Sequence, residues 1–255
     1  PNADWHLEFT ESFSEPCHQP DPDDLIVYYV HSKAHMEAIQ NDMLKMGFEP
    51  KESLNPYWKV QGIEYRDSDG FGVMLSLQEK RIDSLGNCST LLRSKGIETW
   101  DEALNYTQRL PYGRNSSRRI FTKVIKEGQG TCSSKHAFLA QLATENKIAD
   151  VQLMMCIYKM NASNTPGIGE VLLRHDLDYL PEAHCYLQIC NKRIDLTSEK
   201  SDIEVIAKDI IEEQHISAEQ VVEYKVNYHR NFIKNWIKSE KLLLSFDELW
   251  SAREE

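Results

Sequence analysis

A cysteine, a histidine and an aspartate, occurring in that order, are the residues of this chain best suited to covalent chemistry. Cys132 follows the glycine-rich segment 128–131 at the predicted start of a helix, where unpaired backbone N–H groups favour a thiolate. His184 and Asp195 follow on two segments of strand-like composition. A thiolate, a base and an orienting carboxylate are the minimum apparatus for thiol acyl chemistry, in which sulfur attacks a carbonyl carbon.

Whether His184 and Asp195 can meet depends on the loop between their strands. Segments 183–190 and 193–197 predict a hairpin that turns around Asn191 and Lys192. A loop of two or four residues places both side chains on one face of the hairpin, and an odd loop places them on opposite faces. In the even case the carboxylate holds one imidazole N–H, and the other ring nitrogen is free to face the cysteine.

Other polar residues near this group have alternative interpretations. Gln129 is the nearest side chain that could join the Cys132 N–H in stabilising an oxyanion, although polar turn residues more often lie on the surface. Cys132 and His136, at i and i+4, could instead be metal ligands with His184 as a third, but nothing else has ligand spacing. His136 is expected to pack on the helix face, and Cys185 to point into the core. We therefore expect no metal and no cofactor.

The elements that must position these residues form a mixed unit over 84–255. Three helices and a strand are predicted over 100–110, 116–127, 131–146 and 151–160. A loop at 161–169 and the segment 175–179 could form the two walls of a substrate cleft. The C-terminal third, from Ile203 onward, is predicted to be mostly helical and highly charged.

The segments around the three residues resemble the transglutaminase-like branch of the papain-like thiol enzymes. The resemblance rests on Cys132 after its glycine-rich turn, on Ala183-His184-Cys185-Tyr186 and on Asp195-Leu196-Thr197, and it spans roughly residues 100–200. It implies an α+β fold with a papain/transglutaminase-like core, in which the cysteine's helix packs on an antiparallel sheet. It also implies Cys132 as nucleophile, His184 as acid and base, and Asp195 as the orienting carboxylate. Eleven residues separate His184 from Asp195, a spacing shorter than is common in the family, which implies a tight hairpin.

The activity that this resemblance implies is acyl chemistry on an amide or ester carbonyl. The substrate would be a peptide, a protein or a small amide, and the enzyme would be a peptidase, an amidase or an acyl transferase. The alternative is a non-catalytic binding or scaffold protein in which both parts of the chain have lost their chemistry. The two hypotheses differ in the expected reactivity of Cys132.

Residues 1–80 are predicted to form a separate and more acidic unit. Residues 1–83 carry 16 acidic and 7 basic residues, whereas the remainder carries 24 and 22. The pattern predicts a βαβββ module that follows a strand end at 5–10. Its expected elements are a strand over 25–30, a helix from Ser32 to Gly47, and extended segments around 48–52, 61–67 and 71–77.

This unit resembles the vicinal-oxygen-chelate family of glyoxalases, dioxygenases and bleomycin-resistance-like binding proteins. The resemblance rests on His6-Leu7-Glu8-Phe9-Thr10, on Asn55-Pro56-Tyr57-Trp58 and on the Asp-Gly turn before the last strand. Glu8 matches a metal-ligand position, but Met74 stands where a glutamate is expected, so a module that folds and pairs without chemistry is favoured. Such domains carry two modules, and the first is represented here only by its last strand. We therefore expect a homodimer through this unit or completion by upstream residues.

Composition bounds the remaining alternatives. The net charge of −11 does not fit a nucleic-acid-binding protein. No apolar run approaches the roughly 18 residues of a membrane helix, and no signal peptide is visible. The six cysteines are scattered without CxxC spacing, and Cys156, Cys185 and Cys190 are expected to be buried thiols, which fits a reducing cytoplasm. The chain begins at Pro1 rather than at methionine, which is consistent with residues upstream.

Overall fold

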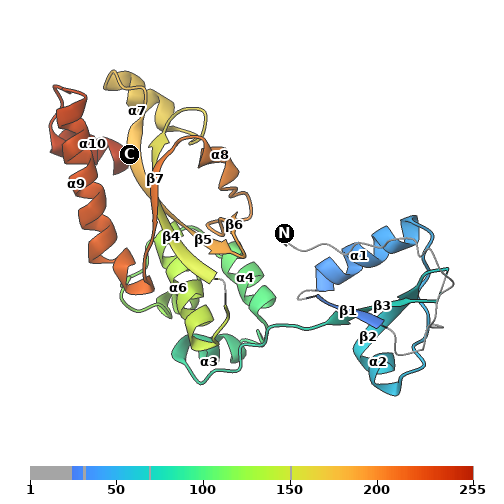
Figure 1. Cartoon of the computed structure of the whole chain (residues 1–255). Coiled ribbons are helices and arrows are strands. Elements are labelled where there is room, and N and C mark those ends of the chain that lie inside the picture. The colour runs from blue at the N-terminus through green and yellow to red at the C-terminus, as the bar shows by residue number, and fades with distance from the viewer. Residues whose placement is uncertain (1–24, 31–32, 69, 150, 255) are drawn as a thin grey trace. The chain divides into compact units, whose positions relative to one another are not determined.

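The computed structural model describes residues 25–30, 33–68, 70–149 and 151–254. It confirms the mixed α+β class and divides into two compact units, Pro1–Lys80 and Arg81–Glu255 (Figure 1). The predicted strand end at 5–10, with Glu8, lies outside the described residues. Among the helices that are described, none combines the length and apolarity needed to cross a membrane.

The first unit is a small sheet with one helix packed on it. Its elements are β1 (Leu25–Val30), α1 (Lys33–Lys45), α2 (Pro56–Gln61), β2 (Gly62–Arg66) and β3 (Gly72–Leu77). The sheet order is β1-β3-β2, with β1 parallel and β2 antiparallel to β3. Val30, Met36, Tyr65 and Leu75 form the core between sheet and helix.

The extended segment predicted around 48–52 is not a strand. A single bridge joins Lys51 to Glu64 there, and the chain then enters α2. Asn55 caps that helix by accepting the Tyr57 N–H, and Pro56 occupies the first turn, where its missing N–H costs nothing. The local capping signal therefore ends the extended segment before it can pair beyond this one bridge.

The second unit is built on a four-stranded antiparallel sheet in the order β6-β5-β4-β7. Its strands are β4 (Val151–Met160), β5 (Leu180–Ile189), β6 (Lys192–Ile194) and β7 (Ile210–His215). Its helices are α3 (Asn87–Arg93), α4 (Trp100–Arg109), α5 (Lys123–Glu127), α6 (Cys132–Glu145), α7 (Ile168–Arg174), α8 (Glu204–Ala207), η1 (Ala218–Val221), α9 (Glu223–Ser239) and α10 (Phe246–Glu254). The strand β7 interrupts the C-terminal third that was predicted to be mostly helical, because its alternating exposure suits pairing with β4.

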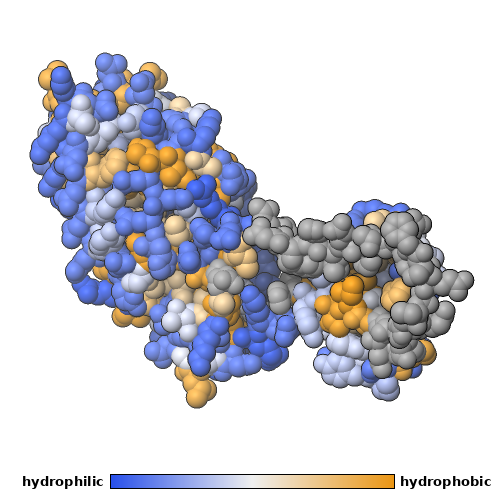
Figure 2. Space-filling view, in the orientation of Figure 1, coloured by the Kyte–Doolittle hydropathy of each residue, from blue (hydrophilic) through white to orange (hydrophobic). Residues whose placement is uncertain are grey.

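Helices cover both faces of this sheet, and the strands separate two cores. Met155 and Cys185, which are partners across β4 and β5, belong to the core that includes α6. Cys156 and Tyr186 point to the other face, into a core with residues of α7, α9 and α10. In the view of Figure 2 the surface is mostly hydrophilic, and a hydrophobic patch is visible on the first unit.

Candidate active site

The start of α6 is fixed by a cap and by a glycine. Thr131 and Ser134 form a capping box, in which each hydroxyl accepts the other residue's backbone N–H. A Cβ on Gly130 would lie 2.8 Å from Lys135 Cγ and 3.0 Å from Ser134 Oγ, so only glycine fits this approach. These features make Cys132 the first residue of the helix.

The first turn of α6 offers hydrogen-bond donors beside the sulfur. The capping box satisfies the Ser134 N–H, whereas the N–H groups of Cys132 and Ser133 have no acceptor among the described residues. The Cys132 sulfur lies 3.8 Å from the Ser133 hydroxyl oxygen and is half-buried. A negative charge at this position is therefore favoured by unpaired donors and by the positive end of the helix dipole.

The hairpin of β5 and β6 has the even loop that a shared face requires. Its two loop residues, Cys190 and Asn191, have φ of +48° and +61°, and Ile189 pairs with Lys192. Continuing this register places Asp195 diagonally across from His184 on one face. His184 Nε2 donates to Asp195 Oδ2 over 2.8 Å, while Asp195 Oδ1 accepts the backbone N–H of Thr197.

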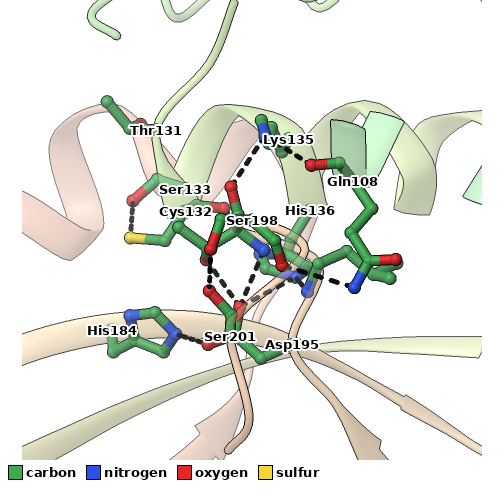
Figure 3. Close-up of polar contacts among 12 residues, drawn as sticks. Gln108, Thr131, Cys132, Ser133, Lys135, His136, His184, Asp195, Ser198 and Ser201 are labelled. Carbon is green, nitrogen blue, oxygen red and sulfur yellow. Dashed lines mark hydrogen bonds and ion pairs between the residues drawn. The ribbon is translucent and has the colours of Figure 1, made fainter. Parts of the chain in front are cut away.

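Cys132, His184 and Asp195 come together at one place. The Cys132 sulfur lies over the side of the His184 ring that carries Nδ1, and Asp195 lies at Nε2 (Figure 3). The side chains of His184 and Asp195 are 16% and 8% exposed, so the group is shielded but open to solvent on one side. The Tyr158 ring packs edge-on against His184, with centroids 6.3 Å apart.

The electrostatics favour an ion pair between thiolate and imidazolium. Burial opposes charge on Cys132, but the charges of His184 and Lys225 and two hydrogen bonds outweigh it, so the pKa of the thiol falls well below its ordinary value. Burial likewise opposes charge on His184, yet the Cys132 thiolate and the Asp195 hydrogen bond raise the pKa of the imidazole. Despite burial, the hydrogen bond and charge of His184 hold the pKa of Asp195 below its usual range. Each group thus stabilises the charged form of its neighbour.

His136 ties the nucleophile's helix to the segment that carries the carboxylate. Its Nδ1–H donates to the Cys132 carbonyl over 2.7 Å, and its Nε2 accepts the Leu196 N–H over 2.8 Å. Burial lowers the pKa of His136 to about 4, so the ring is neutral. Both nitrogens are occupied by backbone, which argues against the alternative in which His136 binds a metal with Cys132 and His184. His136 was expected to pack on the helix face, and the structure shows it fully buried; its role in bracing Asp195 was not predicted.

Lys135 makes a second tie that the sequence analysis missed. The side chain is fully buried, and Nζ donates to the carbonyls of Gln108, Leu110 and Thr197, drawn in part in Figure 3. Burial, partly offset by the Asp195 charge, lowers the pKa of Lys135 to about 8. The available signal was its position between buried residues of α6, since a lysine there needs internal acceptors.

Gln129 lies on the turn before Cys132, and one of its side-chain N–H groups donates to the Arg114 carbonyl over 2.9 Å. The side chain also packs on Gly113, where a Cβ would lie 2.6 Å from Gln129 Cδ. Gln129 therefore braces the neighbouring loop. Its predicted contribution to an oxyanion hole stays a prediction.

A cleft of about 400 Å³ opens beside the imidazole and the carboxylate. The predicted loop 161–169 contributes one wall, braced by Asn164, which donates to the Lys159 carbonyl and to Asp209 over 2.8 Å each. The opposite wall comes from 200–206, not from 175–179 as the sequence suggested, because Tyr179 packs against Trp236 instead. The lining residues are Tyr158, Ser163, Asn164, Pro166, His184, Asp195, Lys200, Ser201, Asp202, Val205 and Ile206.

The other described cysteines differ from Cys132 in their surroundings. Cys88, Cys156 and Cys185 are buried free thiols, and burial raises the pKa of each, to about 11 for Cys185. Cys190 was expected to be buried but is exposed, because the hairpin turns at this residue. Of the cysteines that the structure describes with a shifted pKa, Cys132 alone has it lowered.

Comparisons with known proteins concern part of the chain. Residues 23–76 match the family of the YycE-like C-terminal domain. The uncharacterised protein YycE of Bacillus subtilis (strain 168) is 39% identical over 75 residues, which cover 29% of this chain and 54% of that protein. A solved YycE protein of unknown function from Bacillus subtilis, named as a candidate glyoxalase/fosfomycin resistance protein, is 36% identical over 23% of this chain and 42% of that chain, with a TM-score of 0.22. The chain thus spans about half the length of the curated relative it matches, and the family match lies within the first unit.

Proposed function

We propose that the second unit is a transglutaminase-like thiol enzyme with a papain-like core, which acts on amide or ester carbonyls through Cys132, His184 and Asp195. One observation carries the proposal: the imidazole lies between a half-buried sulfur at a helix start and a carboxylate 2.8 Å from Nε2 (Figure 3). The lowered pKa of Cys132 and the raised pKa of His184 support the same roles.

In the proposed reaction the Cys132 thiolate attacks the carbonyl carbon, and the displaced electron pair moves to the carbonyl oxygen. The unpaired N–H groups of Cys132 and Ser133 are the donors nearest to that oxyanion. His184 gives its Nδ1 proton to the leaving amine or alcohol as the bond to carbon breaks, which leaves a thioester. Water or an amine then attacks the thioester, neutral His184 takes the proton of the attacking group, and the thiolate is regenerated.

The cleft beside His184 and Asp195 supports a peptide, a protein side chain or a small amide as substrate. Its volume of about 400 Å³ suits one side chain or a short segment. Its walls mix aromatic, apolar, hydroxyl and charged groups, which favours an amide-bearing segment over a purely apolar ligand.

Thiol reactivity tests the proposal against the non-catalytic alternative. Cys132 is expected to react with iodoacetamide near neutral pH much faster than exposed Cys190, and His184→Ala is expected to abolish this selectivity. Peptide mapping by mass spectrometry after short exposures measures both rates in one sample. Equal rates for the two cysteines would favour a scaffold.

Trapping of the acyl intermediate tests the activity itself. With peptide amides and an added primary amine, the wild-type chain should yield acyl-Cys132 and then either hydrolysed or aminated product. Cys132→Ala should yield neither, and Cys190→Ala should behave as wild type. The ratio of the two products separates a hydrolase from a transferase.

We propose in addition that the first unit is a glyoxalase-like half that pairs with a second module, either in another copy of the chain or upstream. The family that matches residues 23–76 is described as a C-terminal domain, which supports a missing counterpart. The strand β1, at the edge of the sheet among the described strands, also presents exposed apolar side chains, with Ile26 40% and Tyr29 51% exposed.

A further inference from the structure

Lys225, on α9, is a buried cation close to the candidate active site. The residue is 9% exposed, and its Nζ donates to the Ala183 carbonyl over 2.8 Å. Ala183 immediately precedes His184 on β5. Burying an ammonium group is costly unless nearby groups compensate its charge, so the surroundings of Lys225 need an explanation.

The open edge of β5 brings this ammonium to the nucleophile. Strand residues two apart direct their backbone groups to the same edge, so Ala183 and Cys185 share the edge on which β6 pairs. The ladder with β6 begins only at Leu187, which leaves the backbone groups of Ala183 and Cys185 without a strand partner. The Ala183 carbonyl accepts Lys225 Nζ, and the backbone of Cys185, on the same edge, is one of the groups that lower the pKa of the Cys132 thiol. The strand edge that binds the ammonium therefore belongs to the residues on either side of His184.

The carboxylate whose charge acts on Lys225, Glu182, is engaged elsewhere. Glu182 lies 2.7 Å from Arg253 Nε, in an ion pair that also packs on Trp250. The titratable and charged groups that act on Lys225 are Cys132, Cys185, Glu182 and Arg118. The titratable groups that interact electrostatically with Cys132 are His184, Lys225, Tyr112, Cys156, Tyr158, Glu182 and Cys185. Lys225 and His184 are the cations whose charge favours the thiolate.

We infer that Lys225 is the second cation of the candidate active site, positioned on the β5 edge to hold Cys132 as a thiolate. The inference rests on the proposed thiol chemistry but adds a residue to it. His184 must lose its proton to the leaving group, and the thioester then carries no charge on sulfur. Lys225 keeps its charge throughout and so also favours the return of the thiolate when the thioester is released. It acts as a positioning and electrostatic residue rather than as a proton donor.

The test measures the rate of Cys132 alkylation by iodoacetamide from pH 4 to pH 10 in the full-length chain. Lys225→Gln keeps an N–H donor for the Ala183 carbonyl and removes the charge, whereas Lys225→Arg keeps the charge. Exposed Lys238, on the same helix, provides the matched control Lys238→Gln. We expect the midpoint of the alkylation profile to rise by about one pH unit in Lys225→Gln, which lowers the thiolate fraction about tenfold below the midpoint. Lys225→Arg and Lys238→Gln should keep the wild-type midpoint.

The outcomes separate this inference from the proposed function. A Lys225→Gln midpoint equal to that of wild type, with the wild-type midpoint still well below that of a free thiol, would overturn the role of Lys225 alone. A wild-type midpoint at the value of a free thiol would overturn the thiol chemistry itself. Circular dichroism and a cooperative unfolding transition establish that each variant is folded, and Lys225→Met provides a second neutral variant that should shift the midpoint in the same direction.

Discussion

Asp195 uses its two oxygens for different partners. One accepts from His184 Nε2 and the other from the Thr197 N–H, so the carboxylate is held by its own chain while it orients the ring. The hydrogen bond fixes the tautomer with the proton on Nε2 when the ring is neutral, and Nδ1 is left to exchange a proton with sulfur or substrate. The chemistry proposed for Cys132 therefore depends on a residue that does not touch the sulfur.

Asp195→Asn tests this dependence. The amide cannot stabilise the imidazolium and can present an N–H to Nε2, which favours the wrong tautomer. We expect the rate of acyl-enzyme formation to fall by about 10²- to 10⁴-fold, with the chain still folded. Single-turnover trapping of acyl-Cys132 measures this rate, and an unchanged rate would remove Asp195 from the proposed mechanism.

The pH dependence of the reaction follows from the two shifted groups. The active form needs Cys132 deprotonated and His184 protonated, so activity rises as pH increases through the lowered pKa of Cys132. Activity is lost as pH increases further through the raised pKa of His184. We expect a broad bell in kcat/KM that includes neutral pH, whereas alkylation by iodoacetamide should show only the acid limb because it needs no proton donor. An alkylation profile with its midpoint at the ordinary pKa of a cysteine thiol would contradict the ion pair.

At the scale of elements, α6 organises the second unit. Its cap sets Cys132 at the first turn, and two buried polar side chains that follow, Lys135 and His136, bind α4 and the segment after β6. Helix and hairpin are thus joined by buried hydrogen bonds close to the proposed chemistry. A loss of these bonds should therefore affect folding and activity together.

His136→Asn tests this coupling through stability. Two buried hydrogen bonds are weakened, so we expect a loss of about 2–3 kcal/mol in the free energy of unfolding at pH 7.5. In the wild type the folded pKa of His136, about 4, lies below its unfolded value, so its contribution is full above the unfolded pKa and is lost as pH falls toward the folded pKa. The difference between wild type and variant should therefore shrink at pH 5. Urea unfolding at both pH values measures it, and a constant difference would contradict the neutral, buried ring.

Elements with strong local signals could be predicted from the sequence, and hydrogen bonds between distant segments could not. The predicted helices 100–110 and 131–146 agree with α4 and α6, and the strand 151–160 with β4. The predicted helix 116–127 shortens to α5, and β7 was missed, because pairing with β4 decides its conformation rather than local propensity. The hydrogen bonds of Lys135 join segments more than 20 residues apart, so no local sequence pattern predicts them.

At the scale of the whole chain, the two units differ in how they relate to known proteins. The first matches the YycE-like C-terminal domain over residues 23–76. The function proposed for the second unit depends on the geometry of its own residues. Activity and assembly can therefore be tested separately, one in each unit.

Sedimentation velocity tests the assembly. If the first unit pairs with a second copy, the chain should sediment near twice its 29.6 kDa. Tyr29→Lys, which places a charge on the exposed edge strand, should shift the chain to monomer, whereas Leu243→Lys, on the surface of the second unit, should not. A clean monomer of the unaltered chain at micromolar concentration would contradict the homodimer and leave the hypothesis that upstream residues complete the first unit.

The burial of Lys135 gives the protein an internal reporter. Its amine is sealed from amine-reactive reagents while its three carbonyl acceptors stay assembled around it. Acylation of this one side chain therefore counts the molecules in which the region around Cys132 has come apart, even in a mixture where exposed lysines are already fully labelled.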